Sequence, residues 1–151
     1  MIWYLRVFGV FVLVFALVIF RQSTTQVERV WEITNKPEQV QKVLYDSFQP
    51  KSFRTPVIGE TWETKVMGEV VKCTKTVANS QGNSEFQITT EGFKHYQFLK
   101  ESFQIEPIQN GVRIHGTWEL ETKPNTLSKL LFLFFSNADL NYIADGRQNL
   151  F

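Results

Sequence analysis

The chain has 151 residues, with 16 Lys and Arg against 15 Asp and Glu, so its formal net charge is +1. The basic residues form no cluster, which argues against nucleic acid as a partner. The single cysteine, Cys73, excludes a disulfide within the chain and a zinc site built on cysteines. In a strand of alternating polarity, such a cysteine is typical of a small core residue.

The N-terminal segment is almost wholly apolar. Between residues 2 and 20 only Arg6 is charged. A helix of about 20 apolar residues is long enough to cross the hydrocarbon core of a bilayer. We therefore expect one transmembrane anchor over residues 1–21, a short polar linker over 22–26, and a membrane location through residues 2–20.

Two alternatives to a retained anchor are a cleaved signal peptide and a buried helix. The segment lacks the small-x-small site at which a signal peptidase cuts, and it has no polar side such as a buried soluble helix would show. Arg6 on one flank and Arg21, Arg29 and Lys36 on the other leave the side of the membrane that the domain faces undecided.

The remaining stretch, residues 27–151, has the size of one compact domain. β-branched and aromatic residues over 27–33 predict a strand. Residues 34–47 predict a helix, because Thr34 or Asn35 can cap it and a proline follows in the first turn. A loop is expected over 48–56.

From Gly59 onward the polarity alternates with a period of two, which predicts antiparallel strands joined by glycine turns. The expected strands are 61–67, 70–77, 85–90, 95–108 and 112–121. The fourth should be bulged, because its apolar positions change register between Phe98 and Leu99. In the fifth, Val112, Ile114, Trp118 and Leu120 should point inward and the residues between them should face solvent.

The last segment predicts a long helix capped by Asn125 or Thr126. Its apolar residues at helical spacing are Leu127, Leu130, Leu131, Phe134 and Ala138. Residues 130–135, "LLFLFF", are apolar all round. Such a turn is either covered on both sides or in contact with a ligand or a membrane. Strand, helix, antiparallel strands and a long final helix together indicate the α+β class.

This order resembles the START-like superfamily, also called SRPBCC, of the polyketide cyclase/dehydrase and lipid-transport type. Residues 27–46 look like that family's opening strand and proline-led helix. Residues 59–66 look like its next strand, and 107–121 look like its late hairpin. The resemblance extends over nearly all of 26–151 and rests on patterns rather than on a signature motif.

The resemblance implies a helix-grip fold, in which a curved antiparallel sheet wraps the C-terminal helix and leaves a cavity for a hydrophobic ligand. With 14 Phe and 4 Trp the chain can supply an apolar lining. These rings either fill the core or line a pocket. The residues we expect to line a cavity are Trp62, Phe86, Tyr96, Phe98, Phe103, Trp118, Leu131 and Phe134.

Three functions remain open at this stage. The first is a membrane-tethered module that binds a hydrophobic small molecule or lipid, with the tether raising the effective concentration of ligands from the bilayer. The second is a cyclase- or dehydratase-type enzyme, which requires an ionisable side chain facing the cavity. The third is an interaction domain with a filled core. No catalytic residue, metal or cofactor is predicted, and the oligomeric state is undetermined.

Overall fold

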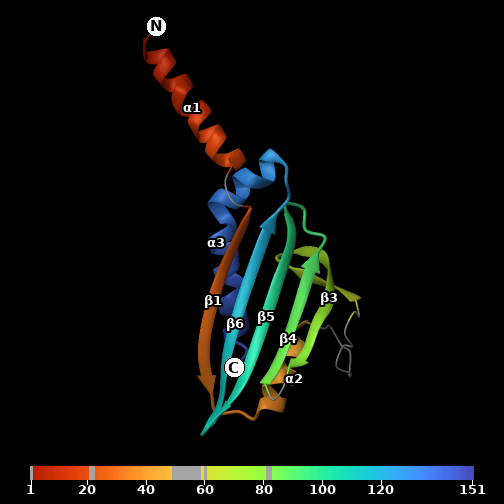
Figure 1. Ribbon diagram of the computed structural model, residues 1–151. Helices are drawn as coiled ribbons and strands as arrows, with labels where there is room; N and C mark the ends of the chain where they lie inside the picture. Colours follow the sequence, from red (N-terminus) through yellow and green to blue (C-terminus); the bar gives the residue numbers. More distant parts are fainter. Residues whose placement is uncertain (1, 21–22, 49–58, 60, 81–82) are drawn as a thin grey trace.

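A computed structural model describes residues 2–20, 23–48, 59, 61–80 and 83–151 of the chain (Figure 1). Three helices and six strands are formed by these residues. They are α1 (Ile2–Phe20), β1 (Thr24–Ile33), α2 (Pro37–Phe48), β2 (Thr61–Val66), β3 (Glu69–Ser80), β4 (Asn83–Glu91), β5 (Tyr96–Ile108), β6 (Gly111–Thr122) and α3 (Thr126–Gln148). The loop expected over 48–56 lies outside the described residues, apart from Phe48 at the end of α2.

The strands form one antiparallel sheet in the order β1-β6-β5-β4-β3-β2. Consecutive strands from β2 to β6 are neighbours, while β1 pairs with β6 and so joins the first strand to the last. The long helix α3 packs on β1 and β6 and covers one face of the sheet (Figure 1). The expected α+β helix-grip architecture is confirmed.

Strand β6 shows the clearest agreement between pattern and structure. The four predicted inner side chains are fully buried, namely Val112, Ile114, Trp118 and Leu120, and the outer residues that alternate with this row are partly exposed. Gly116 belongs to the same inner row. A Cβ at this position would lie 2.3 Å from the ring of Trp118, so only glycine fits there. The alternation of polarity along β6 therefore predicts its buried face correctly, and Gly116 leaves room for the indole of Trp118.

Strand β5 contains the expected irregularity, slightly earlier than the sequence indicates. The register of β5 against β6 shifts between Tyr96 and Phe98. An extra residue in one strand reverses the face to which the following side chains point. As a result Tyr96 is buried, Phe98 is only partly buried, and the inner row continues with Leu99.

Helix α3 begins where the sequence predicts. The side chain of Asn125 accepts a hydrogen bond of 2.8 Å from the backbone N–H of Ser128, which caps the first turn. The apolar residues at helical spacing are not the ones that face the sheet, however. The residues that α3 buries are Ser128, Phe132, Ser136, Leu140, Ile143 and Ala144. Packing against the sheet has turned the helix so that the row of Leu127, Leu130 and Phe134 points outward.

Helix α1 extends away from the sheet and contacts the first part of α3 (Figure 1). Its large apolar side chains are exposed along the length of the helix, from Trp3 and Tyr4 to Leu17. Within the described residues, no helix combines the length and the mean hydropathy that a membrane span requires. The transmembrane anchor expected over residues 1–21 is therefore not found.

Candidate ligand-binding site

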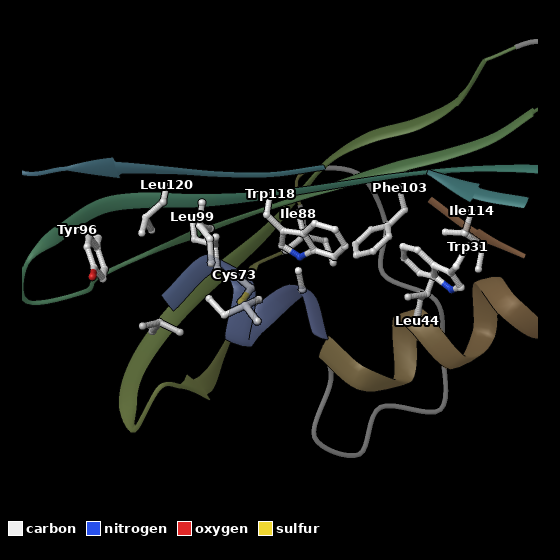
Figure 2. Close-up of a cluster of buried hydrophobic side chains, with 14 of the residues drawn as sticks. Trp31, Leu44, Cys73, Ile88, Tyr96, Leu99, Phe103, Ile114, Trp118 and Leu120 are labelled. Carbon is white, nitrogen blue, oxygen red and sulfur yellow. The ribbon is translucent and has the colours of Figure 1, made fainter. Parts of the chain in front are cut away.

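The inner face of the sheet is centred on packed aromatic rings. The ring of Phe103 meets that of Trp118 edge to face, with the centroids 5.5 Å apart. On the other side, Trp31 from β1 lies nearly parallel to Trp118 at 6.3 Å. Figure 2 shows these rings below the sheet, with Leu44 of α2 reaching toward them. Aromatic side chains bury large areas, so this cluster dominates the core at the middle of the sheet.

A buried ion pair lies next to these rings. Glu101 of β5 has no exposed surface, and its carboxylate accepts hydrogen bonds from Arg147 on both oxygens, at 2.9 and 3.1 Å. The indole N–H of Trp118 donates to the same carboxylate at 2.9 Å. Arg147 also donates to the hydroxyl of Ser47 at 3.2 Å. The guanidinium of Arg147, at the end of α3, thus links Glu101 of the sheet with the last turn of α2.

The charges of this pair stabilise each other inside the protein. Burial opposes the charge on Arg147, but the carboxylate of Glu101 attracts and hydrogen-bonds the guanidinium, and the pKa of Arg147 is raised. Nearby, burial is the main cause that raises the pKa of the Cys73 thiol, which contacts the Thr90 hydroxyl at 3.3 Å. The thiol is therefore neutral at ordinary pH, and the guanidinium of Arg147 stays protonated.

An open hollow of about 500 Å³ lies between β2 and the C-terminal half of α3. We call it the β2–α3 hollow. Val66 and Met67 line it on the sheet side, and Tyr142 and Ile143 line it on the helix side. Arg147 borders the hollow as well, so one residue connects it with the buried carboxylate. The rest of the lining is mostly polar and includes Thr64, Lys65, Asp145 and Asn149. Apolar surface beside polar groups that can orient a ligand is found in small-molecule sites.

A second hollow, of about 430 Å³, lies at the far end of the β5–β6 hairpin and is lined mainly by polar groups such as Glu32, Thr34 and Asn110. It borders neither the aromatic cluster nor the buried ion pair. The β2–α3 hollow is therefore the better candidate for a hydrophobic ligand.

Four of the expected lining residues belong to the core. Phe103 and Trp118 lie at its centre, and Trp62 of β2 is half-buried and packs against it. Tyr96 is buried between Phe93 and Phe132, and its hydroxyl donates to the carboxylate of Asp139. The structure brings these rings together as packing partners.

The other four expected lining residues are placed differently. Phe98 lies on the opposite face of β5 from Leu99, and Leu131 is half-buried. Phe134 is 68% exposed on the outer side of α3. The side chain of Phe86 lies outside those that the structure describes. Of the seven whose side chains are described, none borders the β2–α3 hollow.

Sequence reasoning missed Glu101 and Arg147, although a signal for both is present. Glu101 occupies an inner position of β5, between Leu99 and Phe103. Arg147 follows Ile143 at helical spacing on the buried side of α3. Because each apolar row contains one charged residue of opposite sign, the pattern predicts that Glu101 and Arg147 pair with each other. The 46 residues between them make this pairing hard to recognise in the sequence.

The fold is shared with solved structures, although no protein-family model and no curated protein matches the sequence. Norcoclaurine synthase from Thalictrum flavum, as a point mutant with a transition state analogue, aligns with a TM-score of 0.57 and 13% identity, over 86% of this chain and 95% of that one. The same enzyme in complex with dopamine and hydroxybenzaldehyde aligns with a TM-score of 0.55 and 14% identity, over 84% and 86%.

A START superfamily protein from Mycobacterium smegmatis aligns with a TM-score of 0.51 and 13% identity, over 81% of this chain and 95% of that one. At these identities the comparison establishes the fold alone. The protein has the START-like helix-grip fold.

Proposed function

We propose that this protein binds a hydrophobic small molecule or a lipid in the β2–α3 hollow. The observation that carries the proposal is the hollow of about 500 Å³, in which Val66, Met67 and Ile143 offer apolar surface beside polar groups that include the guanidinium of Arg147. It lies between the sheet and the long helix of a helix-grip fold. Binding there would bury apolar ligand surface and give Arg147 and Ser47 as polar contacts that orient the ligand.

The structural neighbours support this proposal by analogy. Norcoclaurine synthase was solved in complex with dopamine and hydroxybenzaldehyde, which are small aromatic molecules. A ligand of similar size would fit the volume of the hollow, and its ring would contact Met67, Tyr142 and Ile143.

An enzyme of the cyclase or dehydratase type is the second candidate, and the buried ion pair favours it. Such an enzyme needs an ionisable group at its cavity, and Arg147 borders the hollow. However, the carboxylate of Glu101 has no exposed surface and is engaged by Arg147 and Trp118. A proton transfer by Glu101 would require these contacts to open first, so we favour binding over catalysis.

We further propose that α1 inserts into a lipid membrane. Its apolar side chains are exposed on every side, and a helix of this kind is stable only where apolar surroundings cover it completely. We propose insertion into the bilayer rather than a complete span, because no described helix meets the requirements for a span. The full chain should float with lipid vesicles, and a chain that starts at Ser23 should not.

Substitution of Gly146 tests the ligand site without damage to the core. Gly146 borders the hollow, and among the described atoms none lies within 4 Å of an added Cβ. We expect Gly146→Leu to fill part of the hollow and abolish binding, while the loss of a helical glycine stabilises α3 by up to about 1 kcal/mol. Gly146→Ala is the matched control that removes the glycine but leaves the hollow open.

The measurement is native mass spectrometry, followed by lipid extraction, on a chain that starts at Ser23 and is purified from cells. Circular dichroism first verifies that this chain is folded. A hydrophobic molecule of defined mass on the parent and on Gly146→Ala, but not on Gly146→Leu, supports the β2–α3 hollow as its site. A bare mass for all three, with no shift across a panel of lipids and aromatic molecules, contradicts the proposal and favours an interaction domain.

A further inference from the structure

The outer face of the first half of α3 is apolar. Leu127 is 62% exposed, Leu130 38%, Phe134 68% and Phe135 53%. The spacing of Leu127, Leu130 and Phe134 places them on one side of the helix, and Phe135 adjoins them. We call these four residues the outer α3 face.

The inner face of the same segment carries two serines. Ser128 and Ser136 are buried against the sheet side together with Phe132. A helix on a water-exposed surface shows the opposite arrangement, with serines outside and phenylalanines inside. Phe132 follows that arrangement, but the two buried serines and the exposed large apolar side chains depart from it, which indicates that the outer α3 face is not in water when the protein functions.

The outer α3 face adjoins α1. The first turns of α3 lie beside the domain-proximal end of α1, and the two helices are in contact (Figure 1). Helix α1 exposes apolar side chains all along its length, including Phe8, Phe11 and Leu13. The two helices thus present neighbouring apolar surfaces.

We propose that the outer α3 face rests in the same lipid bilayer as α1, which gives the domain a second membrane contact and a defined orientation. The proposal rests on the membrane insertion of α1 and deepens it. A protein groove or a second copy of the chain covers a helix from one side, whereas a bilayer covers α1 on every side. Between Thr122 and Ala138 the sequence has two lysines and no acidic residue, which suits a surface of lipid phosphates.

The test measures whether residue 134 enters lipid in the full chain. Cys73, which is buried, is replaced by serine, and Phe134→Cys provides one site for an environment-sensitive nitrobenzoxadiazole label. Val30→Cys is the matched control, because Val30 is 58% exposed on β1. Both labelled chains are reconstituted with vesicles of zwitterionic and anionic phospholipid and are floated. Leu130→Cys is a second site in case the label at 134 disturbs the fold.

We expect the emission of the label at 134 to move to shorter wavelength in vesicles and to be quenched by nitroxide groups on the lipid acyl chains. The label at 30 should show neither change. Identical behaviour of the two labels in chains that do float overturns the second contact but leaves the insertion of α1 intact. A shift that depends on protein concentration without lipid assigns the face to a second copy and also overturns the proposal. A chain that does not float contradicts the insertion of α1 and this contact together. None of these outcomes bears on the ligand site.

Discussion

At the scale of single residues, Glu101 is the charged residue that the described core buries. Its carboxylate is removed from water completely, and it is satisfied by two donors on Arg147 and one on Trp118. A buried pair of this kind adds little net stability over apolar residues, but the loss of one partner leaves an unpaired charge in the interior. Glu101 and Arg147 are therefore coupled more strongly than their distance in sequence indicates.

We expect Arg147→Met to destabilise the protein by about 3–5 kcal/mol, because the carboxylate of Glu101 stays buried without its cation. Combination with Glu101→Gln should restore most of the loss, since the amide oxygen still accepts from Trp118 and carries no charge. Urea denaturation of the single and double variants measures this coupling.

A solvent-exposed pair provides the control for this cycle. Arg113 bonds Glu32 at 2.7 Å, with side chains 44% and 52% exposed. Arg113→Met should cost less than about 1 kcal/mol because water replaces the lost partner. Equal costs for Arg147→Met and Arg113→Met would contradict the account of the buried pair.

The raised pKa of Tyr96 makes the stability of the fold depend on pH in the alkaline range. Burial, and then its hydrogen bond to Asp139 and the charge of that carboxylate, raise the pKa of Tyr96 well above its ordinary value. Above the unfolded-state pKa of about 10, the unfolded chain loses this proton while the folded chain keeps it, so stability falls as pH rises. Below about pH 10 the contribution of Tyr96 is fully present.

Tyr96→Phe should therefore weaken the decline in stability above about pH 10, and the lost hydrogen bond should cost about 1 kcal/mol at neutral pH. Denaturation midpoints across the alkaline range measure this effect. Tyr142→Phe, which changes an exposed tyrosine of α3, should retain the decline of the parent chain. An unchanged decline in Tyr96→Phe would show that other groups control alkaline unfolding.

At the scale of elements, α1 is the helix that depends least on the rest of the protein. It contacts the domain mainly at α3, and its apolar side chains are exposed rather than packed. We expect a chain that starts at Ser23 to keep its stability within about 0.5 kcal/mol, the usual range for changes away from the core. Denaturation of this chain beside the full chain in mild detergent measures the difference. A large loss would mean that α1 is part of the folding unit.

Strand boundaries were predictable where turn residues mark them. Gln109 and Asn110 separate β5 from β6 as expected. The turn between β2 and β3 is formed by Met67 and Gly68, both with positive φ, and lies one residue earlier than the sequence predicts. At the other extreme, β1 begins at Thr24, inside the stretch expected as a linker. Residues 24–26 are polar, and it is their pairing with β6 that makes them a strand. No local pattern contains that information.

At the scale of the whole molecule, the β2–α3 hollow and the outer α3 face lie at different levels along the same helix. Phe134 and Gly146 are twelve residues apart on α3, or roughly 18 Å along a helix that rises 1.5 Å per residue. With the outer α3 face in the bilayer, the hollow lies toward the other end of α3 from the lipid contact.

By itself, the sequence determined the α+β class, the alternating buried row of β6, the Asn125 cap of α3 and the apolar character of α1. These properties arise from residues close together in the chain, whose spacing matches the period of a strand or a helix. Only the tertiary structure decided that Glu101 meets Arg147, that α3 turns Phe134 outward, and that the hollow lies beside Val66 and Ile143. These features depend on strand pairing and on the rotation of a helix against the sheet. Both are set by the best packing of distant side chains, which no local pattern specifies.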